Sequence, residues 1–260
     1  MAVALEHLLV EDAPPAVVIT LNRPDKLNAL STGLMKELTQ ELLRQSERKE
    51  IQVVVLKGAG RAFSAGHDMK ELQGRTLDEE REIFRVCETL METVRTLTQP
   101  VIAAVHGIAT AAGCQLVATC DLAIATEDAR FATNGIRNGI FCYTPQVPVS
   151  RSIARKRAFY MVITGDFIDA KTAAEWGLIN AVVKAEELDS EVSKLAAKIG
   201  SLSPVAVRTG KKAFYQQLDQ DMSNALDLMS EEISCNLMTA DAQEGISAFL
   251  EKRPPVWKGE

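Results

Sequence analysis

The chain has 260 residues, of which 47% are hydrophobic and 25% are charged. This composition is ordinary for a soluble globular protein, and the length suits one large domain, alone or with a smaller appendage. The net charge of −6 at pH 7 provides no general basic surface, so we expect no nucleic-acid partner.

The first half of the chain predicts alternating strands and helices. Continuous apolar runs predict buried strands at residues 16–21, 53–56, 101–105 and 122–125. A helix that Ser31 or Thr32 would cap has its predicted apolar face on Leu34, Met35, Leu38, Leu42 and Leu43. A second helix is predicted from a capping box at Thr76 and Glu79 to about Leu97. Its predicted apolar face is Ile83, Phe84, Cys87, Leu90, Met91 and Val94.

The second half of the chain is mostly helical in its pattern. Helices are predicted at residues 170–175, 187–199, 205–217, 222–237 and 242–251. Because the earlier helices alternate with strands that are apolar throughout, the sequence indicates an α/β protein with a parallel sheet.

Cysteine and histidine usage bears on compartment and metal binding. The five cysteines form no C-x-x-C pair, and the three histidines lie far apart in the chain. Reduced thiols and no metal site are the simplest interpretation. Residues 1–7 resemble neither a signal peptide nor a transit peptide, and no uncharged apolar run approaches the length of a membrane span. We therefore expect a cytoplasmic protein without a membrane partner.

The segment Ala-Thr-Ala-Ala-Gly-Cys-Gln-Leu at residues 109–116 is the most informative motif. It follows the predicted strand 101–105 and combines small residues with the start of a helix. Backbone N–H groups are unpaired at a helix start, and they can hold a developing negative oxygen. Small residues packed at a strand–helix junction would give the same pattern without a ligand.

Further motifs occur along nearly the whole chain. They are Leu-Asn-Arg-Pro at 21–24, Leu-Asn-Ala at 27–29, Phe-Ser-Ala-Gly-His-Asp at 63–68, Leu-Ile-Asn at 178–180 and Glu-Gly-Ile-Ser-Ala-Phe-Leu-Glu-Lys-Arg at 244–253. In this order the motifs resemble the enoyl-CoA hydratase/isomerase (crotonase) family.

The resemblance implies a fold, an assembly and a ligand. The implied fold is a ββα superhelix (spiral) core over residues 1–200, followed by a helical region at 201–260 used for oligomerisation. The implied assembly is a trimer or a dimer of trimers. The implied ligand is an acyl-CoA thioester, and we expect no separate cofactor.

The resemblance also implies which backbone groups hold the thioester oxygen. By motif matching they are the N–H groups of His67 and Ala112, with the small Ala111 and Gly113 allowing the thioester to approach. Two such donors would stabilise the enolate-like oxygen by about 3–4 kcal/mol each in the transition state.

The CoA moiety is expected on two loops and the C-terminal motif. The implied backbone cradle includes Lys26, Leu27, Ala29, Ala65, Gly66 and Asp68. The implied charged contacts are Arg23, Lys26 and Lys70, while Phe249 and Lys252 would reach the CoA of a neighbouring subunit. A solvent-exposed surface charge remains the alternative for each cation, and a structural capping role is the alternative for Asp68.

Two positions depart from the pattern of the family's hydratases, which carry glutamates there. The matching residues here are Gln115 and Gly135. An amide orients water but does not accept and return a proton near pH 7, and glycine has no side chain. Because no Asp or Glu occurs between Asp128 and Asp166, a small shift in alignment does not restore the acid.

Three residues are considered as substitutes. His67 is a candidate proton carrier, and Cys142 is a candidate nucleophile without an evident base. Arg137 is a candidate for recognising an acyl group that carries a carboxylate. The sequence leaves open an inefficient hydratase, another enzyme of this type such as a decarboxylase, thioesterase or isomerase, and a non-catalytic acyl-CoA binding or sensing protein.

Overall fold

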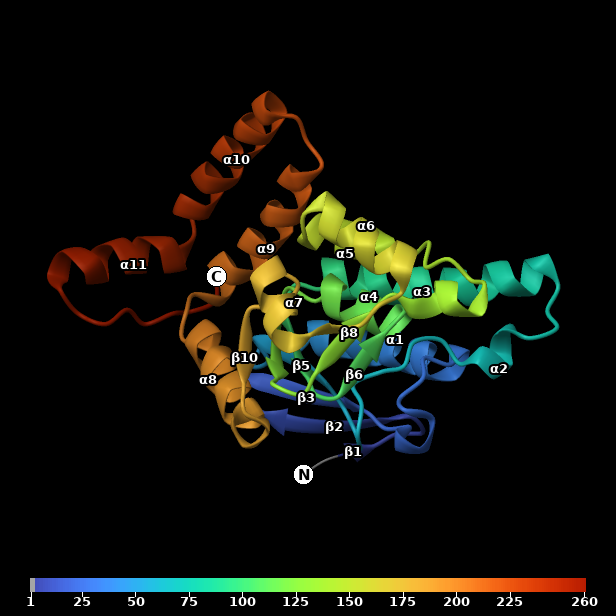
Figure 1. Ribbon diagram of the computed structural model, residues 1–260. Coiled ribbons are helices and arrows are strands. Elements are labelled where there is room, and N and C mark those ends of the chain that lie inside the picture. The colour runs from blue at the N-terminus through green and yellow to red at the C-terminus, as the bar shows by residue number, and fades with distance from the viewer. Residues whose placement is uncertain (1–2) are drawn as a thin grey trace.

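A computed structural model of the chain describes residues 3–260. Met1 and Ala2, with which the predicted region 1–200 begins, lie outside the described residues. A seven-stranded sheet forms the centre of the molecule in the order β1-β2-β3-β4-β5-β7-β10 (Figure 1). Its strands are β1 (Val3–Ala4), β2 (Leu8–Ala13), β3 (Ala16–Leu21), β4 (Val53–Gly58), β5 (Val101–Val105), β7 (Leu122–Thr126) and β10 (Ala181–Val183).

The part of the sheet from β3 to β10 is parallel, as the sequence predicts. The edge strands β1 and β2 pair antiparallel and were not predicted, because β1 is very short and β2 carries polar residues. A second sheet has three strands and supports the site described below. Its strands are β6 (Ile108–Thr110), β8 (Arg130–Ala132) and β9 (Ile168–Asp169).

The predicted helices are all present, whereas α2, α5 and α6 were not predicted. The helices up to residue 164 are α1 (Thr32–Ser46), α2 (Met69–Leu72), α3 (Leu77–Thr96), α4 (Ala112–Thr119), α5 (Gln146–Ser152) and α6 (Arg155–Thr164). The later helices are α7 (Ala170–Trp176), α8 (Leu188–Gly200), α9 (Pro204–Leu218), α10 (Met222–Leu237) and α11 (Ala240–Glu251). Short 3₁₀ helices are η1 (Pro24–Lys26), η2 (Asn134–Asn138) and η3 (Ala185–Glu187). Within residues 3–260, no helix combines the length and apolar character needed to cross a membrane.

Two predicted caps are present at the helix starts. The Ser31 hydroxyl accepts the N–H of Leu34 at 3.2 Å, and Thr76 and Glu79 form the reciprocal capping box of α3. Leu43 is a correction to the predicted face of α1, because its side chain is 53% exposed. It follows Leu42 directly, and adjacent helical residues point about 100° apart, so Leu43 falls beyond the buried stripe.

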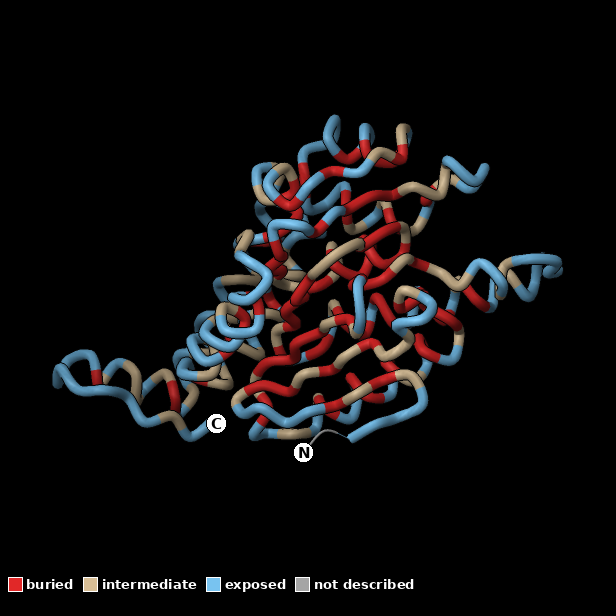
Figure 2. The backbone as a smooth tube through the Cα atoms, turned by 60° about the horizontal axis from the view of Figure 1, so that its bottom comes forward, coloured by how far each residue is buried: buried red, intermediate tan, exposed pale blue. Residues whose placement is uncertain are grey.

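The parallel strands are buried on both faces. Alternate residues of β4 face opposite sides, so that Val54 and Leu56 join the core beneath α1 and α3 while Val53 and Val55 join a second core beneath α8. The tube coloured by burial shows buried residues concentrated in the central strands and exposed residues on the outlying segments (Figure 2). Helices on both faces explain why these strands are continuously apolar in sequence.

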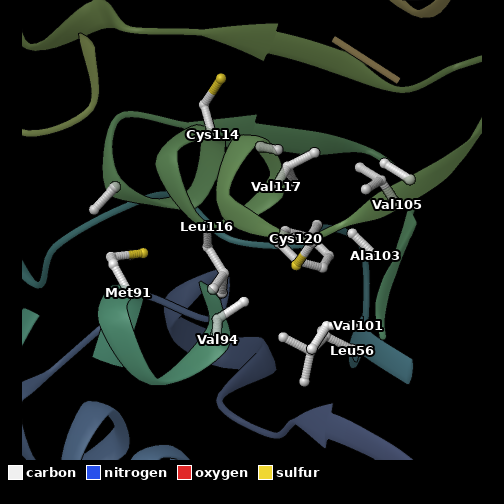
Figure 3. Packing of buried hydrophobic residues seen from close by; sticks show 14 of the residues in the cluster. Leu56, Met91, Val94, Val101, Ala103, Val105, Cys114, Leu116, Val117 and Cys120 are labelled. Atoms are coloured by element: carbon white, nitrogen blue, oxygen red, sulfur yellow. The ribbon is translucent and has the colours of Figure 1, made fainter. Parts of the chain in front are cut away.

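Helix α4 is almost entirely enclosed. Figure 3 shows Leu116 of α4 beside Met91 and Val94 of α3, within the main hydrophobic core. This packing fixes the orientation of α4, and therefore the position of its N-terminus, from several sides.

Helix α9 is joined to the core by a buried ion pair. The Lys211 ammonium donates to the Asp121 carboxylate at 2.7 Å and to the carbonyl oxygens of Val94 and Gln99. The Tyr215 hydroxyl donates to the other Asp121 oxygen at 2.8 Å. Beyond this joint, α10 and α11 extend away from the body of the molecule (Figure 1).

Replacing Lys211 is expected to destabilise the protein. Lys211→Met leaves the mostly buried Asp121 without its counter-charge, which costs about 3 kcal/mol in free energy of unfolding. Chemical denaturation at fixed protein concentration measures the change, and Lys212→Met, at an exposed neighbouring position, is the matched control. Equal midpoints for the two variants would contradict this assignment.

Candidate active site

Two segments far apart in sequence meet at the edge of the small sheet. The loop 63–68 follows β4, and Ser64 pairs with Ala109 of β6 through N–H donation from Ser64 to Ile108 and from Thr110 to Ser64. On its other side the same loop pairs with Leu30, whose N–H donates to the Gly66 carbonyl at 2.7 Å. The loop is therefore held on both sides by backbone hydrogen bonds.

Glycines allow this close approach. Gly66 has φ +91°, and a Cβ atom on it would lie 2.8 Å from the Thr110 oxygen and 3.1 Å from the Ala112 nitrogen. A Cβ on Gly113 would overlap the Ser64 carbonyl. Both positions consequently require glycine, and the peptide groups of the two segments lie next to each other.

The chain turns sharply into α4 at Ala111. This residue has φ 48° and ψ −118°, a conformation that costs a non-glycine residue about 1–3 kcal/mol. Its own N–H donates to the Ala132 oxygen at 2.9 Å, which holds the turn in place. Ala112 then begins the helix, where the backbone N–H has no partner within the helix.

The N–H groups of His67 and Ala112 have no hydrogen-bond partner among residues 3–260. For His67 the reason is the pairing with Leu30, which uses the Gly66 carbonyl and the Asp68 N–H and turns the N–H of His67 to the other side. The structure thus leaves both N–H groups free on two segments that lie next to each other.

A cavity of about 410 Å³ adjoins these donors. Its lining is mainly apolar and comes from the loop 63–68, α2, α3, the start of α4, η2 and the segment 140–145. The lining residues are Ala65, His67, Met69, Leu72, Phe84, Ala111, Ala112, Asn134, Gly135, Asn138, Ile140, Phe141, Cys142, Tyr143, Thr144 and Pro145. An apolar cavity with a few convergent polar groups is typical of a small-molecule site.

His67 is neutral in this cavity. Its imidazole packs edge-on against Phe84 with ring centroids 5.1 Å apart. Burial lowers the pKa of His67 to about 4, and the nearby Glu71 opposes this only weakly. The Glu71 carboxylate instead accepts the N–H and hydroxyl of Thr32, both at 2.7 Å.

Comparison with known proteins agrees with this architecture. The family model described as enoyl-CoA hydratase/isomerase matches residues 14–260. The chain belongs to the enoyl-CoA hydratase/isomerase family.

Individual relatives are similar over most of their length. The rat protein named enoyl-CoA hydratase domain-containing protein 3, mitochondrial, is 45% identical over 92% of this chain and 80% of its own. The crystal structure of an enoyl-CoA hydratase from Mycobacterium smegmatis matches with a TM-score of 0.95 and 45% identity, covering 97% of this chain and 99% of that one. That of human enoyl-CoA hydratase domain-containing protein 3 matches with a TM-score of 0.94 and 42% identity, covering 97% and 100%.

These matches confirm the predicted crotonase fold.

The expected cytoplasmic location is wrong by the same comparison, because similar relatives from rat, mouse and human are named mitochondrial. The prediction had depended on reduced thiols and the appearance of the first residues, and neither of these distinguishes the cytoplasm from the mitochondrial interior.

Among the residues predicted to bind CoA, Arg23 and Asp68 are engaged with each other. Arg23 donates to the Asp68 carboxylate at 2.9 Å and to the Ala29 carbonyl at 2.7 Å. Burial raises the pKa of Asp68, but the hydrogen bond and charge of Arg23 outweigh it and leave the pKa below its usual range. Asp68 also caps α2 through the N–H of Lys70. The pair holds the two expected CoA loops together.

The remaining basic residues of these loops are exposed. Lys26 and Lys70 take part in no ion pair among residues 3–260. Leu27 is held by the N–H of Ala65, which donates to its carbonyl at 2.9 Å, and Ala29 is buried beneath the loop. Lys26 and Lys70 are therefore two exposed cations without an ion-pair partner among the described residues.

The structure does not bring Phe249, Lys252 or Arg137 to the cavity of the same chain. Phe249 is 82% exposed on α11, and Lys252 follows at its end in the projecting region. Arg137 forms an ion pair with Asp166, which also accepts the Tyr160 hydroxyl. The charge of Arg137 is thus neutralised outside the cavity, although Asn134, Gly135 and Asn138 of η2 line the cavity.

Gln115 lies just behind the cavity wall. Its side chain is only 5% exposed, and its Oε1 atom is buried without a hydrogen-bond partner among the described residues. Helical side chains lean toward the N-terminus, so Gln115 lies over the turn that carries Ala112. Gln115 itself is not among the residues that line the cavity.

Gly135 lines the cavity, but the space for a side chain there is filled. A Cβ atom on Gly135 would lie 2.5 Å from the Ile140 oxygen and 3.0 Å from the Cys142 sulfur. The backbone of Gly135 is also tied to this segment, because its carbonyl accepts the N–H of Ile140 and its N–H donates to the Cys142 sulfur at 3.4 Å. The space that a side chain at position 135 would need is therefore occupied by the neighbouring segment.

Cys142 has the environment of a protonated thiol. Burial raises the pKa of the thiol, and only the N–H of Gly135 opposes this effect. A thiolate is the reactive form, so these surroundings disfavour a nucleophilic role.

Several lining residues were not predicted as site residues. Phe84 and the residues around Ile140 look like core or loop residues in the sequence, and only folding places them on the cavity. Asn28 is fully buried and holds the loop junction by donating to the carbonyls of Ala59 and Ala62. In the sequence, the only indication of this role of Asn28 is its position inside the motif at residues 27–29.

The buried neutral His67 predicts a loss of stability on acidification. Between its unfolded pKa of 6.5 and its folded pKa of about 4, only the unfolded chain binds a proton. Stability therefore falls as the pH is lowered through this window, by about 3 kcal/mol, and the effect levels off below it. Denaturation at several pH values checks this, with His67→Phe expected to show a shallower decline; parallel curves would refute it.

A side chain at position 135 is expected to destabilise the fold. Gly135→Ala forces the Ile140 backbone to move, which costs about 1–3 kcal/mol. The control is Gly210→Ala in α9, where a Cβ meets nothing and alanine favours the helix. Thermal unfolding compares the two, and an unshifted midpoint for Gly135→Ala would show that the segment yields freely.

Proposed function

We propose that this protein binds an acyl-CoA thioester, with the thioester oxygen accepting the N–H groups of His67 and Ala112. The observation that carries the proposal is the pair of free backbone donors beside an apolar cavity. Such donors are aligned in advance by the fold and need no reorganisation when the ligand binds. The cavity would receive the acyl chain.

The CoA portion would lie over the two loops that the Arg23–Asp68 pair joins. Lys26 and Lys70 are exposed and free to meet phosphate groups. Phe249 and Lys252 would serve the site of a second copy in a trimer or dimer of trimers. Exposed apolar side chains on α9–α11, among them Phe214, Leu226, Ile233 and Leu250, support such an assembly.

The same site is poorly suited to hydrate a double bond. No acidic side chain lines the cavity among the described residues, and His67 is neutral with a low pKa. Loss of one general acid or base costs about 10²- to 10⁴-fold in rate. We therefore propose that the chain retains thioester binding and carbonyl polarisation, without the pair of proton carriers that hydration needs.

The role of the two N–H groups is testable with a matched pair of ligands. S-butyl-CoA lacks only the carbonyl oxygen of butyryl-CoA. Two net hydrogen bonds of about 1 kcal/mol each predict that butyryl-CoA binds about 30-fold more tightly. Isothermal titration calorimetry measures both, with free CoA as the control. Equal affinities would contradict the proposed site.

Turnover measurements separate binding from chemistry. Crotonyl-CoA hydration is expected at least about 10⁴-fold below that of a hydratase with both glutamates. Gln115→Glu alone is expected to leave hydration slow, because Gly135 still provides no partner. Rapid hydration by the unaltered chain would overturn the proposed loss of hydratase chemistry, while a different product from another acyl-CoA would identify a related enzyme.

A further inference from the structure

A second cavity, of about 470 Å³, lies between α6 and α7 and the strand β9 that connects them. Its lining residues are Lys156, Arg157, Tyr160, Phe167, Ile168, Asp169, Thr172 and Trp176. Among residues 3–260, the two cavities share no lining residue. The second cavity is large enough for a small molecule, and it is separate from the proposed acyl-CoA site.

Three aromatic rings line this cavity. The rings of Tyr160 and Trp176 lie 6.3 Å apart at an angle of 84°. The Tyr160 hydroxyl donates to Asp166 at 2.9 Å, and the Arg157 guanidinium lies 5.5 Å from the centre of the Trp176 ring. Tyr160 and Phe167 are 45% and 38% exposed. The cavity therefore presents aromatic faces that are held by neighbouring polar groups, and such faces stack on planar rings.

The segment that forms α6 is positively charged, although the chain as a whole is acidic. No Asp or Glu occurs between Asp128 and Asp166, whereas this stretch contains six basic residues. They are Arg130, Arg137, Arg151, Arg155, Lys156 and Arg157. Among residues 3–260, Arg137 is the only one of the six that forms an ion pair. The other five cations are therefore available to an anion.

The first turn of α6 concentrates this charge at the cavity. Arg155, Lys156 and Arg157 are its first three residues, at the end of the helix where the dipole favours negative groups. The N-cap residue Ala154 provides no side-chain acceptor for the N–H groups of this turn. Lys156 and Arg157 also line the cavity. Backbone and side chains at this end thus both favour an anion.

Acidic side chains at the cavity are already engaged. Asp169 is the one acid among the described lining residues, and its carboxylate accepts the N–H of Thr172 at 2.7 Å as the cap of α7. Asp166 forms an ion pair with Arg137. Within the described part of the chain, neither carboxylate forms an ion pair with Lys156. A ligand would therefore supply the counter-charge for Lys156.

We propose that this second cavity binds a nucleoside phosphate. The base would stack on the rings of Tyr160 and Phe167, and the phosphates would lie at Lys156 and the first turn of α6. A phosphate alone would leave the aromatic faces unused, and an uncharged aromatic molecule would leave the cations without a counter-charge. A planar ring joined to a phosphate uses both features, and its binding does not depend on the proposed acyl-CoA function.

Calorimetry with ADP, pyrophosphate and adenosine tests the two parts of the ligand. Coenzyme A also carries an adenosine phosphate, so saturating butyryl-CoA is present throughout to occupy the proposed acyl-CoA site. ADP is expected to bind at least about fivefold more tightly than either fragment, because a stacked base and a paired phosphate each contribute such a ratio. Absence of ADP binding under these conditions would overturn the proposal, and so would equal affinities for ADP and pyrophosphate.

Tryptophan fluorescence locates the bound nucleotide. The chain has two tryptophans, and Trp257→Phe leaves Trp176 in the cavity as the one reporter. ADP is expected to quench the emission of Trp176 with the dissociation constant that calorimetry gives. Binding of ADP without any change in this emission would overturn the location.

Substitutions separate the contribution of charge from that of stacking. Lys156→Glu is expected to weaken ADP binding about tenfold, whereas Lys171→Glu, at an exposed position outside the lining, changes it about twofold or less. Phe167→Ala is expected to weaken ADP about fivefold and to leave pyrophosphate unchanged, with Phe159→Ala outside the lining as its control. Equal effects within either matched pair would overturn the assignment of that group to the site.

Discussion

The site depends on the close approach of two backbone segments at Gly66 and Gly113. Neither position has room for a Cβ atom, because carbonyl oxygens of the facing segment occupy that space. The approach is maintained by backbone hydrogen bonds from Ser64 and Thr110 and by the Arg23–Asp68 pair. The two free N–H groups are consequences of this packing. They belong to the main chain, so substitution of nearby side chains leaves the donors in place as long as the fold persists.

Holding a ligand oxygen and transferring a proton place different demands on a site. Holding a thioester oxygen requires only main-chain geometry, which the interlocked loops and the turn at Ala111 provide. Moving a proton requires side chains with suitable pKa values at defined points. At position 135 the backbone of Ile140 occupies the space of a side chain, so main chain forms this part of the cavity wall. At position 115 the chain has a buried amide on α4.

A second interaction connects the C-terminal helices to the end of α4. Lys211 and Tyr215 on α9 both bind Asp121, which directly follows the end of α4. The base of the projecting helices and the helix that begins at Ala112 therefore share one buried carboxylate. Helices α10 and α11 expose large apolar side chains. An assembly that covers these side chains would also hold the C-terminal region, which Asp121 connects to the body of the molecule.

Much of the fold was determined by local sequence pattern. Apolar runs fix the buried parallel strands, because burial on both faces leaves no polar alternation. Ser31 and Thr76 mark helix starts through bonds formed within one turn. The motif order along the chain predicted the family. Short strands such as β6 and β8 were not recognised, because three residues are too few to show a period.

Tertiary structure decided what these local patterns do not contain. Leu43 looks like a core residue and is exposed, Phe84 looks like core and lines the cavity, and Arg137 looks free and is paired with Asp166. The neutrality of His67 and the closure over Gly135 also depend on contacts between distant segments. The sequence by itself determined most of the elements and the family, because periodicity and main-chain motifs are local. Burial, pairing and available space arise only when distant residues pack together, and these decided the charge state and the shape of the site.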